Sequence, residues 1–139
     1  MINLTNFKVL SNLYICPTPI GNLQDISARV LDTLETVDVI YCEDTRRARK
    51  LIENFSISTP LKSYFVGNEK IKIAEIEKTL SEGKNVALIS DAGTPLISDP
   101  GNDLIRHLII NNFNIISIPG PSSVLTALTL SGFELSEFQ

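Results

Sequence analysis

The sequence predicts an α/β fold of three layers, with a largely parallel sheet in the middle and helices on both of its faces. Short apolar runs rich in branched residues alternate with longer stretches of helical period, which is the pattern of repeated βα units. The chain has 139 residues and a hydrophobic content of 43%, enough to bury one core. We therefore expect a single compact domain.

Five apolar runs are the predicted strands. They read LYIC (13–16), VDVIYC (37–42), LKSYF (61–65), NVALIS (85–90) and NIISI (114–118). Two of these runs end in the cysteines of the chain, Cys16 and Cys42. Thiols at the ends of buried strands favour two free cysteines over a disulfide.

Helical periodicity fills the segments between the runs. Apolar residues at three- and four-residue spacings predict one amphipathic helix over residues 23–37 and a second over residues 45–55. A third helix is predicted to end at Gly83, where a left-handed C-cap is usual. A fourth covers residues 104–109, and a fifth begins near Val124.

Charge and hydropathy exclude several classes of protein. The net charge of −4 and the charged fraction of 20% are typical of a soluble enzyme-like domain, not of a disordered or fibrous chain. No apolar stretch is long enough to cross a bilayer, and the N-terminal segment lacks the continuous apolar centre of a secretory signal. We therefore expect a cytoplasmic protein with no membrane partner. The acidic balance also argues against binding nucleic acid by bulk charge.

The loops after the first, fourth and fifth predicted strands combine proline and glycine with short polar side chains. They are PTPIGN (17–22), SDAGTP (90–95) and PGPSS (119–123). Proline and glycine fix sharp turns and expose backbone N–H and C=O groups. In open α/β sheets, ligands bind beyond the carboxyl ends of the strands. We therefore expect these loops to converge at one edge of the sheet and to hold a neutral, polar ligand.

Four motifs make the sequence similar to a known family. PTPIGNLxDI, VDxIxxEDTRR, VALISDAGTPLISDPG and IPGPSSxxTALxxSGF occur in this order, within a similarity that covers residues 13–138. They resemble the branch of the tetrapyrrole methylase superfamily that 2′-O-methylates a cytidine of bacterial small-subunit ribosomal RNA. The resemblance implies a class III methyltransferase, in which residues 1–139 are the S-adenosylmethionine-binding N-terminal α/β domain and the C-terminal domain is absent.

The resemblance also implies S-adenosylmethionine as the cofactor, bound in a cleft between two domains. Carried over by motif, its contacts are Pro19 in the first loop, Asp91, Ala92, Gly93, Thr94 and Ile97 in the fourth, and Ser122 and Ser123 in the fifth. An alternative stays open for Asp91, whose carboxylate can instead hold the loop by accepting hydrogen bonds from nearby N–H groups. The chain departs from the family at Ser123, usually alanine, and at Gly67, commonly histidine.

Three charged residues after the second predicted strand are candidate catalytic groups. Glu43 and Asp44 are candidates for a general base, or for orienting one, and Arg46 for binding a substrate phosphate. Structural alternatives stay open: Arg46 can pair with these carboxylates, and we favour a helix cap for Asp44, as for Asp25 and Asp103. No cluster of histidine and cysteine predicts a metal site.

The implied partners are small-subunit ribosomal RNA, within the ribosomal subunit, and a second copy of the chain. We expect the homodimer to bury apolar residues of the final segment, namely Leu130, Phe133, Leu135 and Phe138. Two other functions compete. One is a C-methyltransferase acting on a tetrapyrrole precursor, whose first loop reads Gly-Pro-Gly-Asp where this chain has Pro-Ile-Gly-Asn. The other is a catalytically inactive, truncated homologue.

Overall fold

The computed structural model describes residues 11–137, and within them five strands form one parallel sheet. The strands lie in the order β3-β2-β4-β1-β5, and every neighbouring pair is parallel. Their bounds are β1 Asn12–Cys16, β2 Val39–Cys42, β3 Leu61–Ser63, β4 Val86–Ile89 and β5 Asn114–Ser117. All five predicted strands are thus present, with ends within two residues of the predicted ones.

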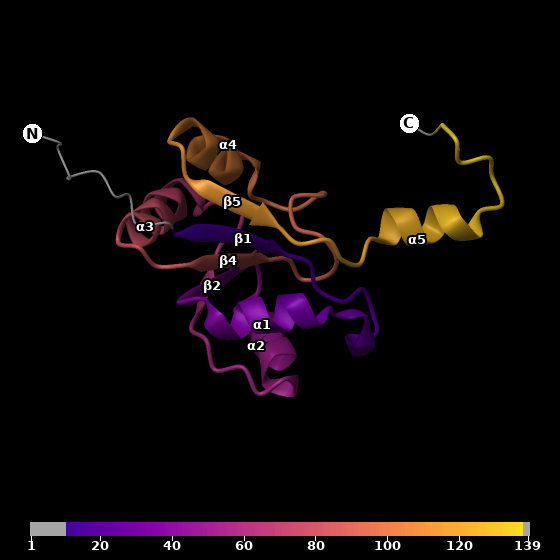
Figure 1. Ribbon diagram of the computed structural model, residues 1–139, viewed down its shortest axis with the longest axis horizontal. Coiled ribbons are helices and arrows are strands. Elements are labelled where there is room, and N and C mark those ends of the chain that lie inside the picture. Colours follow the sequence, from indigo (N-terminus) through magenta and orange to yellow (C-terminus); the bar gives the residue numbers. More distant parts are fainter. Residues whose placement is uncertain (1–10, 138–139) are drawn as a thin grey trace, which may run out of the picture.

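Six helical segments accompany the sheet in the described residues. They are the 3-10 helix η1 Leu23–Asp25 and the α-helices α1 Ala28–Thr36, α2 Thr45–Asn54, α3 Glu69–Ser81, α4 Asn102–Ile110 and α5 Ser123–Leu130. Helices α1 and α2 cover one face of the sheet, and α3 and α4 cover the other (Figure 1). The predicted three layers are confirmed.

The order of the strands explains which face each helix covers. From β1 the chain runs through α1 to β2 and then through α2 to the edge strand β3. It returns through α3 to β4 and then through α4 to β5. A crossover between parallel strands is almost always right-handed, so reversing the direction of travel moves the helices to the opposite face. This reversal leaves the loops after β1, β2 and β4 side by side at the carboxyl edge.

A separate apolar cluster holds each face of the sheet. Beneath α1 and α2, side chains such as Val30, Leu34 and Ile52 pack on Ile40 and Ala87 of the central strands. The cluster on the other face joins α3 and α4 to the sheet, through Ile76, Leu80, Leu104 and Leu108 against Leu13, Tyr41, Val86 and Leu88. Cys16 and Cys42 are both buried and free, as predicted.

The prediction of one helix over residues 23–37 is wrong at its start. The segment is divided in two, because the Ser27 hydroxyl accepts a hydrogen bond from a backbone N–H of the next turn and begins α1 there. Asn22 caps η1 in the same way, so Asp25 lies inside η1 and is not the predicted cap. Since no residue of η1 is buried, this short helix lies at the surface beside the first loop.

The other predicted helix ends have mixed outcomes. The Asp44 carboxylate caps α2 by accepting a hydrogen bond of 2.8 Å from the N–H of Arg46, as favoured. Asp103 is not a cap, because the N-cap of α4 is Gly101. The φ of Gly101 is 133°, a conformation that glycine adopts without strain. Gly83 has the predicted left-handed conformation, with φ of 80°.

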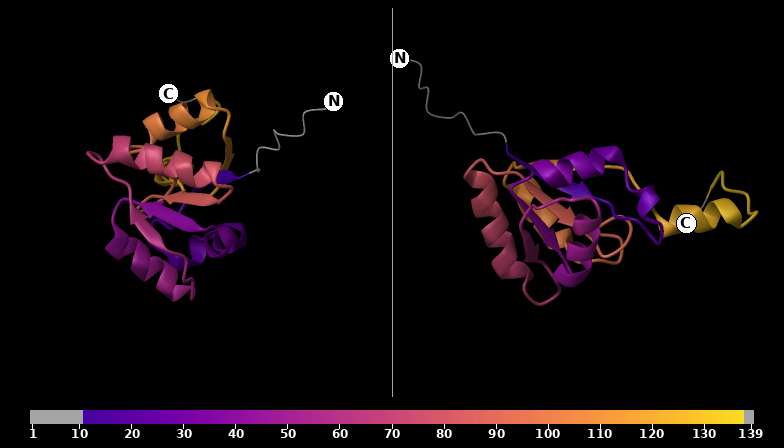
Figure 2. Two further views of the ribbon diagram at one scale, coloured as in Figure 1. Left: turned by 90° about the vertical axis from the view of Figure 1, so that its left-hand side faces the viewer. Right: turned by 90° about the horizontal axis from the view of Figure 1, so that it is seen from below.

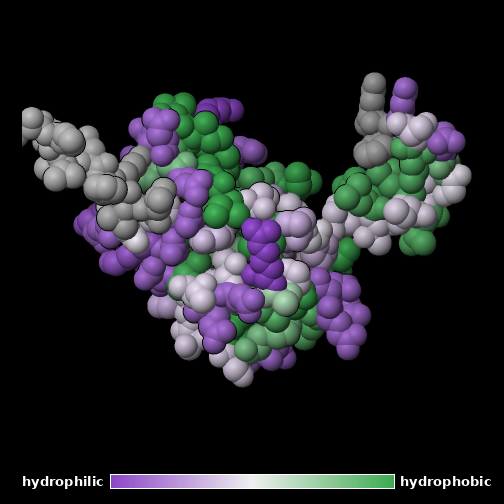
Figure 3. All heavy atoms as spheres, in the orientation of Figure 1, coloured by the Kyte–Doolittle hydropathy of each residue, from purple (hydrophilic) through white to green (hydrophobic). Residues whose placement is uncertain are grey.

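Helix α5 projects away from the three layers (Figures 1 and 2). None of its residues is buried, and apolar side chains gather on this projecting part of the molecule (Figure 3). Leu130 and Phe133 are 83% and 76% exposed, and Leu135 is half-buried. Phe138, the fourth predicted dimer contact, lies outside the described residues.

A charged network ties β2 and the edge strand β3 to α3. The Glu75 carboxylate accepts hydrogen bonds from the hydroxyl of Tyr41 at 3.0 Å, from Lys72 at 2.7 Å and from Lys62. Burial by itself raises the pKa of Glu75, but these three hydrogen bonds outweigh it and lower the pKa to about 2.

This network predicts an acid-dependent loss of stability. The pKa of Glu75 is lower in the folded chain than in the unfolded one, so its contribution is complete above about pH 5 and is lost as the pH falls toward 2. We expect Glu75→Gln to reduce the free energy of unfolding at neutral pH by on the order of 1 kcal/mol, after solvent screening. Urea denaturation of both proteins at neutral pH and near pH 3 measures this. A difference that does not shrink at low pH would contradict it.

Candidate functional site

The three Pro/Gly loops meet at the carboxyl edge of the sheet, as predicted. Thr18 of the first loop and Gly93 of the fourth exchange two backbone hydrogen bonds, of 2.9 and 3.0 Å. The hydroxyl of Thr94 donates to the carbonyl of Pro121 at 3.0 Å and so joins the fourth loop to the fifth. Residues from three separate parts of the chain therefore form one surface.

Close packing between these loops depends on Gly120. A Cβ atom at that position would lie 2.3 Å from Cγ and 2.8 Å from Cβ of Pro17. Carbon atoms in contact are normally about 3.5–4.0 Å apart, so only glycine allows the fifth loop to approach the first this closely.

The residues implied to bind cofactor differ in what they can offer. Both backbone polar groups of Gly93 are bonded to Thr18, so Gly93 can provide close approach but no further N–H. The Ser122 hydroxyl caps α5, and Ser123, the first residue of α5, is exposed. The Thr94 hydroxyl donates to Pro121, but its oxygen can still accept a hydrogen bond from a ligand. Pro19 is half-buried, and Ala92 is exposed. Hydroxyls and backbone groups of this kind suit a neutral or zwitterionic ligand.

Ile97 is held outward by an unusual stretch of backbone. The residues on either side of it, Leu96 and Ser98, have φ angles of 76° and 67°. Positive φ is rare for a bulky residue, and such strain clusters at ligand-binding sites. Leu96 is anchored against the core beneath α3 and α4, whereas Ile97 is 64% exposed. The fourth loop thus presents one apolar side chain beside the polar groups.

Asp91 joins the fourth loop to the loop after β2. Its Oδ1 atom accepts a hydrogen bond of 3.3 Å from the N–H of Asp44, and its Oδ2 atom pairs with Arg47 at 3.0 Å. Two roles were considered for Asp91, a cofactor contact and a carboxylate that holds its loop. The hydrogen bonds in the structure correspond to the second role. The sequence pattern carried no sign that Asp91 lies near Arg47.

Asp44 and Arg46 form a bidentate ion pair. Nε of Arg46 donates to Oδ1 of Asp44 at 3.1 Å and Nη2 to Oδ2 at 2.9 Å. This side-chain hydrogen bonding is the main cause that lowers the pKa of Asp44 to about 2. A carboxylate with such a pKa is a poor proton acceptor at neutral pH, which disfavours Asp44 as a general base.

Glu43 lies in a different environment from its neighbour. It is exposed and lines a small cavity of about 10 Å³ with Ser90, Asp99 and Tyr64. The buried hydroxyl of Tyr64 has no hydrogen-bond partner within the described residues. Burial, and then the charge of Asp91, raise the pKa of Asp99. The sequence pattern did not indicate Tyr64 as a residue near the site.

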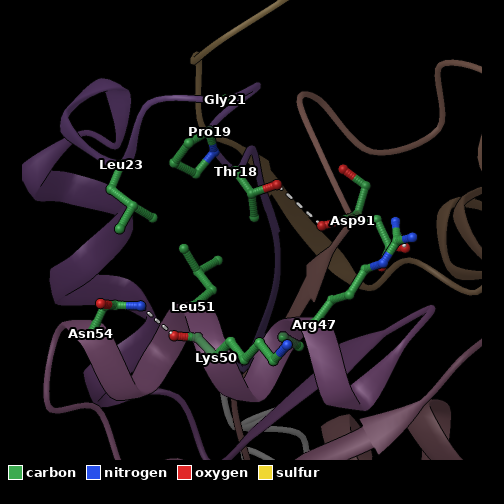
Figure 4. Close-up of a pocket in the computed structure, with 11 residues that line it drawn as sticks. Thr18, Pro19, Gly21, Leu23, Arg47, Lys50, Leu51, Asn54 and Asp91 are labelled. Carbon is green, nitrogen blue, oxygen red and sulfur yellow. Dashed lines mark hydrogen bonds and ion pairs between the residues drawn. The ribbon is translucent and has the colours of Figure 1, made fainter.

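A larger pocket, of about 260 Å³, opens between the first loop and α2 (Figure 4). Leu23 of η1 and Leu51 of α2 point into it from opposite sides, and Arg47 reaches across toward Asp91. The full lining consists of Thr18, Pro19, Gly21, Leu23, Arg47, Ala48, Lys50, Leu51, Asn54, Ser90 and Asp91. Several of these residues were not predicted, because their proximity depends on how η1 and α2 pack.

Other chemistry is not indicated at this edge. Burial raises the pKa of Cys16 and of Cys42 to about 12, which makes both thiols unreactive. Within residues 11–137, no group of three or more His, Cys, Asp or Glu side chains is arranged to hold a metal ion. Among the helices of the same residues, none has the length and apolar character needed to span a bilayer.

Relatives with assigned names match most of this chain. Three proteins named "Ribosomal RNA small subunit methyltransferase I" come from Thermotoga maritima, Mycoplasmopsis pulmonis and Bacillus subtilis. They are 46%, 47% and 46% identical and match 93%, 91% and 86% of this chain. The matched regions cover 58%, 57% and 41% of the relatives themselves. The chain therefore spans about half the length of these relatives.

Solved structures share the fold at low sequence identity. Diphthine synthase matches 93% of this chain and 52% of its own, with a TM-score of 0.74 and 18% identity. Uroporphyrin-III-C-methyltransferase from Thermus thermophilus matches 91% of this chain and 54% of its own, with a TM-score of 0.66 and 20% identity. These likenesses establish the class III methyltransferase fold that the motifs implied.

The profile of one sequence family matches residues 12–139, which include all five strands and the three convergent loops. The chain therefore belongs to the tetrapyrrole (corrin/porphyrin) methylases.

Proposed function

We propose that this chain is the N-terminal, S-adenosylmethionine-binding part of a methyltransferase that 2′-O-methylates a cytidine of small-subunit ribosomal RNA. One observation carries the proposal. Relatives at 44–47% identity, from bacteria as distant as Thermotoga maritima, Mycoplasmopsis pulmonis and Escherichia coli, share one name that specifies the small-subunit ribosomal RNA. They match 91–93% of this chain, including the loops at the carboxyl edge.

The convergent loops are the proposed cofactor site. Thr94, Ser122 and Ser123 would hold the polar parts of the cofactor through their hydroxyls, and Pro19, Ala92 and Ile97 would contact its apolar surface. Gly93 would allow its close approach. When bound, S-adenosylmethionine supplies a methyl group activated by a positively charged sulfur. Because transfer is an in-line displacement, the task of these loops is to fix the position of the donor.

The residues after β2 would act on the accepting ribose hydroxyl. Glu43 is the stronger candidate for the general base, since its carboxylate is exposed at the edge where the loops meet. Asp44 is already paired with Arg46 and caps α2. Arg46 is 88% exposed despite this pair, which leaves its outer surface accessible to a phosphate.

The proposal includes a homodimer in the cytoplasm, where ribosomal subunits are assembled. The exposed apolar side chains of Leu130 and Phe133 support self-association, because surfaces of this kind tend to be covered. The tetrapyrrole-precursor alternative draws its support from solved structures at 20% identity or less, which establish fold alone. No residue of the described site favours it.

Methyl transfer from radiolabelled S-adenosylmethionine tests the proposed function. The chain, and a version of it extended by a second domain, are each incubated with small ribosomal subunits from cells that lack the modification, and with a porphyrin precursor in parallel. We expect label in the ribosomal RNA alone, at a ribose 2′ position after nuclease digestion. Label in the porphyrin would establish the C-methyltransferase instead. Cofactor binding without label in either substrate would indicate an inactive homologue.

A further inference from the structure

Helix α2 carries an unusual concentration of positive charge for this acidic chain. Four of the 12 Lys and Arg residues occupy five consecutive positions, as Arg46, Arg47, Arg49 and Lys50. All four are exposed. The helix contains a single carboxylate, Glu53. Clustered cations on a chain of net charge −4 indicate a local anion-binding surface.

The four cations divide into two pairs with different roles. Arg46 and Arg47 are engaged by Asp44 and Asp91 in ion pairs of 2.9 and 3.0 Å. Arg49 and Lys50 make no ion pair within the part of the chain that the structure describes. Their charges are therefore available to an external anion.

The large pocket lies directly beside these cations. Lys50 belongs to its lining, and the apolar side chains of Leu23 and Leu51 face each other across it (Figure 4). Thr18 and Ser90, from the loops of the proposed cofactor site, line the same pocket. Its volume of about 260 Å³ is below the roughly 300–1,000 Å³ of sites for drug-sized ligands, so it suits a single nucleoside.

We propose that this pocket receives one nucleotide of a single-stranded RNA segment that lies along α2. Its base and ribose contact Leu23 and Leu51, and the adjoining phosphates contact Arg49 and Lys50. The inference rests on the proposed function and specifies where its RNA substrate binds. Single-stranded RNA fits this arrangement because its unstacked bases can leave the strand and enter a pocket, while its phosphates follow an exposed row of cations.

Salt-dependent binding tests the cationic part. The dissociation constant of a short, fluorescein-labelled single-stranded RNA is measured by anisotropy between about 50 and 200 mM salt. Each phosphate contact on a single strand contributes about 0.7 to the slope of log affinity against log salt. The double variant Arg49→Gln/Lys50→Gln should therefore bind more weakly, with a slope shallower by about 1.4. Lys70→Gln/Lys78→Gln, which removes two exposed charges from α3, should keep the slope of the unaltered chain.

A second variant pair tests the pocket. Leu23→Ala should lower RNA affinity several-fold at every salt concentration and leave the slope unchanged, because an apolar contact releases no counterions. Leu23 belongs to η1, which buries no residue, so the substitution should not disturb the fold. Ile71→Ala is the matched control, since Ile71 is 74% exposed on α3.

The outcomes separate this inference from the proposed function. If the chain methylates small ribosomal subunits but the α2 variants bind and react like the unaltered chain, the inference is wrong and the function stands. If no methylation occurs but the Arg49/Lys50 and Leu23 variants both show the expected loss of RNA binding, the surface is supported and the function fails. Absence of RNA binding by the unaltered chain overturns the inference. So does equal competition by poly-glutamate at the same charge concentration, which would assign the surface to an acidic protein.

Discussion

Replacing Gly120 with alanine is expected to weaken the binding of S-adenosylmethionine by about tenfold or more. The added methyl group would lie 2.3 Å from the ring of Pro17, whose closed ring cannot rotate away. The fifth loop must therefore move away from the first, and it carries with it the carbonyl of Pro121, to which the hydroxyl of Thr94 is bonded. Overpacking of this kind costs about 1–3 kcal/mol, and every 1.4 kcal/mol lost from binding corresponds to about tenfold in affinity.

Calorimetric titration with S-adenosylmethionine measures this loss, and urea denaturation measures the accompanying change in stability. Gly132→Ala is the matched control, because a Cβ atom there meets nothing within 4 Å. It should leave cofactor affinity unchanged, although its φ of 71° adds a modest strain to the backbone. Unchanged affinity in Gly120→Ala would show that the junction of the first and fifth loops does not form the cofactor site.

Glu43→Gln is expected to reduce the rate of methyl transfer by about a hundredfold, while cofactor affinity changes little. A positioned general base typically contributes about 10²–10⁴-fold, and the amide of glutamine cannot accept the ribose proton. Glu43 is the expected general base because its neighbour Asp44, whose pKa is lowered to about 2 by hydrogen bonding to Arg46, is a weak base. Single-turnover measurements at saturating cofactor isolate the transfer step from binding.

Two variants distinguish catalysis from structure in this experiment. Glu53→Gln removes an exposed carboxylate from the same helix region and should leave the rate unaltered. Asp44→Asn should change the rate far less than Glu43→Gln, since asparagine is also a good helix cap. A rate in Glu43→Gln close to that of the unaltered chain would assign proton removal to another group or to solvent.

The layers of the fold were predictable because periodicity reports burial. Residues of β2 and β4 are buried on both faces, and this requires the continuous apolar runs from which the strands were identified. The apolar stripe over residues 23–37 gave a wrong helix start, because periodicity alone does not show that the Ser27 side chain caps a helix beginning at residue 28. This capping separates η1 from α1. As a result Leu23 is not buried beneath a continuous helix: it is 44% exposed and lines the pocket.

The sequence by itself determined that three Pro/Gly loops follow three strands, and parallel strands bring such loops to one edge. Only the tertiary structure decided which side chains meet there. Asp91 contacts Arg47 because β4 lies beside β2 in the sheet, although these residues are 44 positions apart in the chain. Tyr64 reaches the same edge because β3 pairs with β2. Strand order and helix packing result from contacts between distant residues, and such contacts leave no periodic signal in a single sequence.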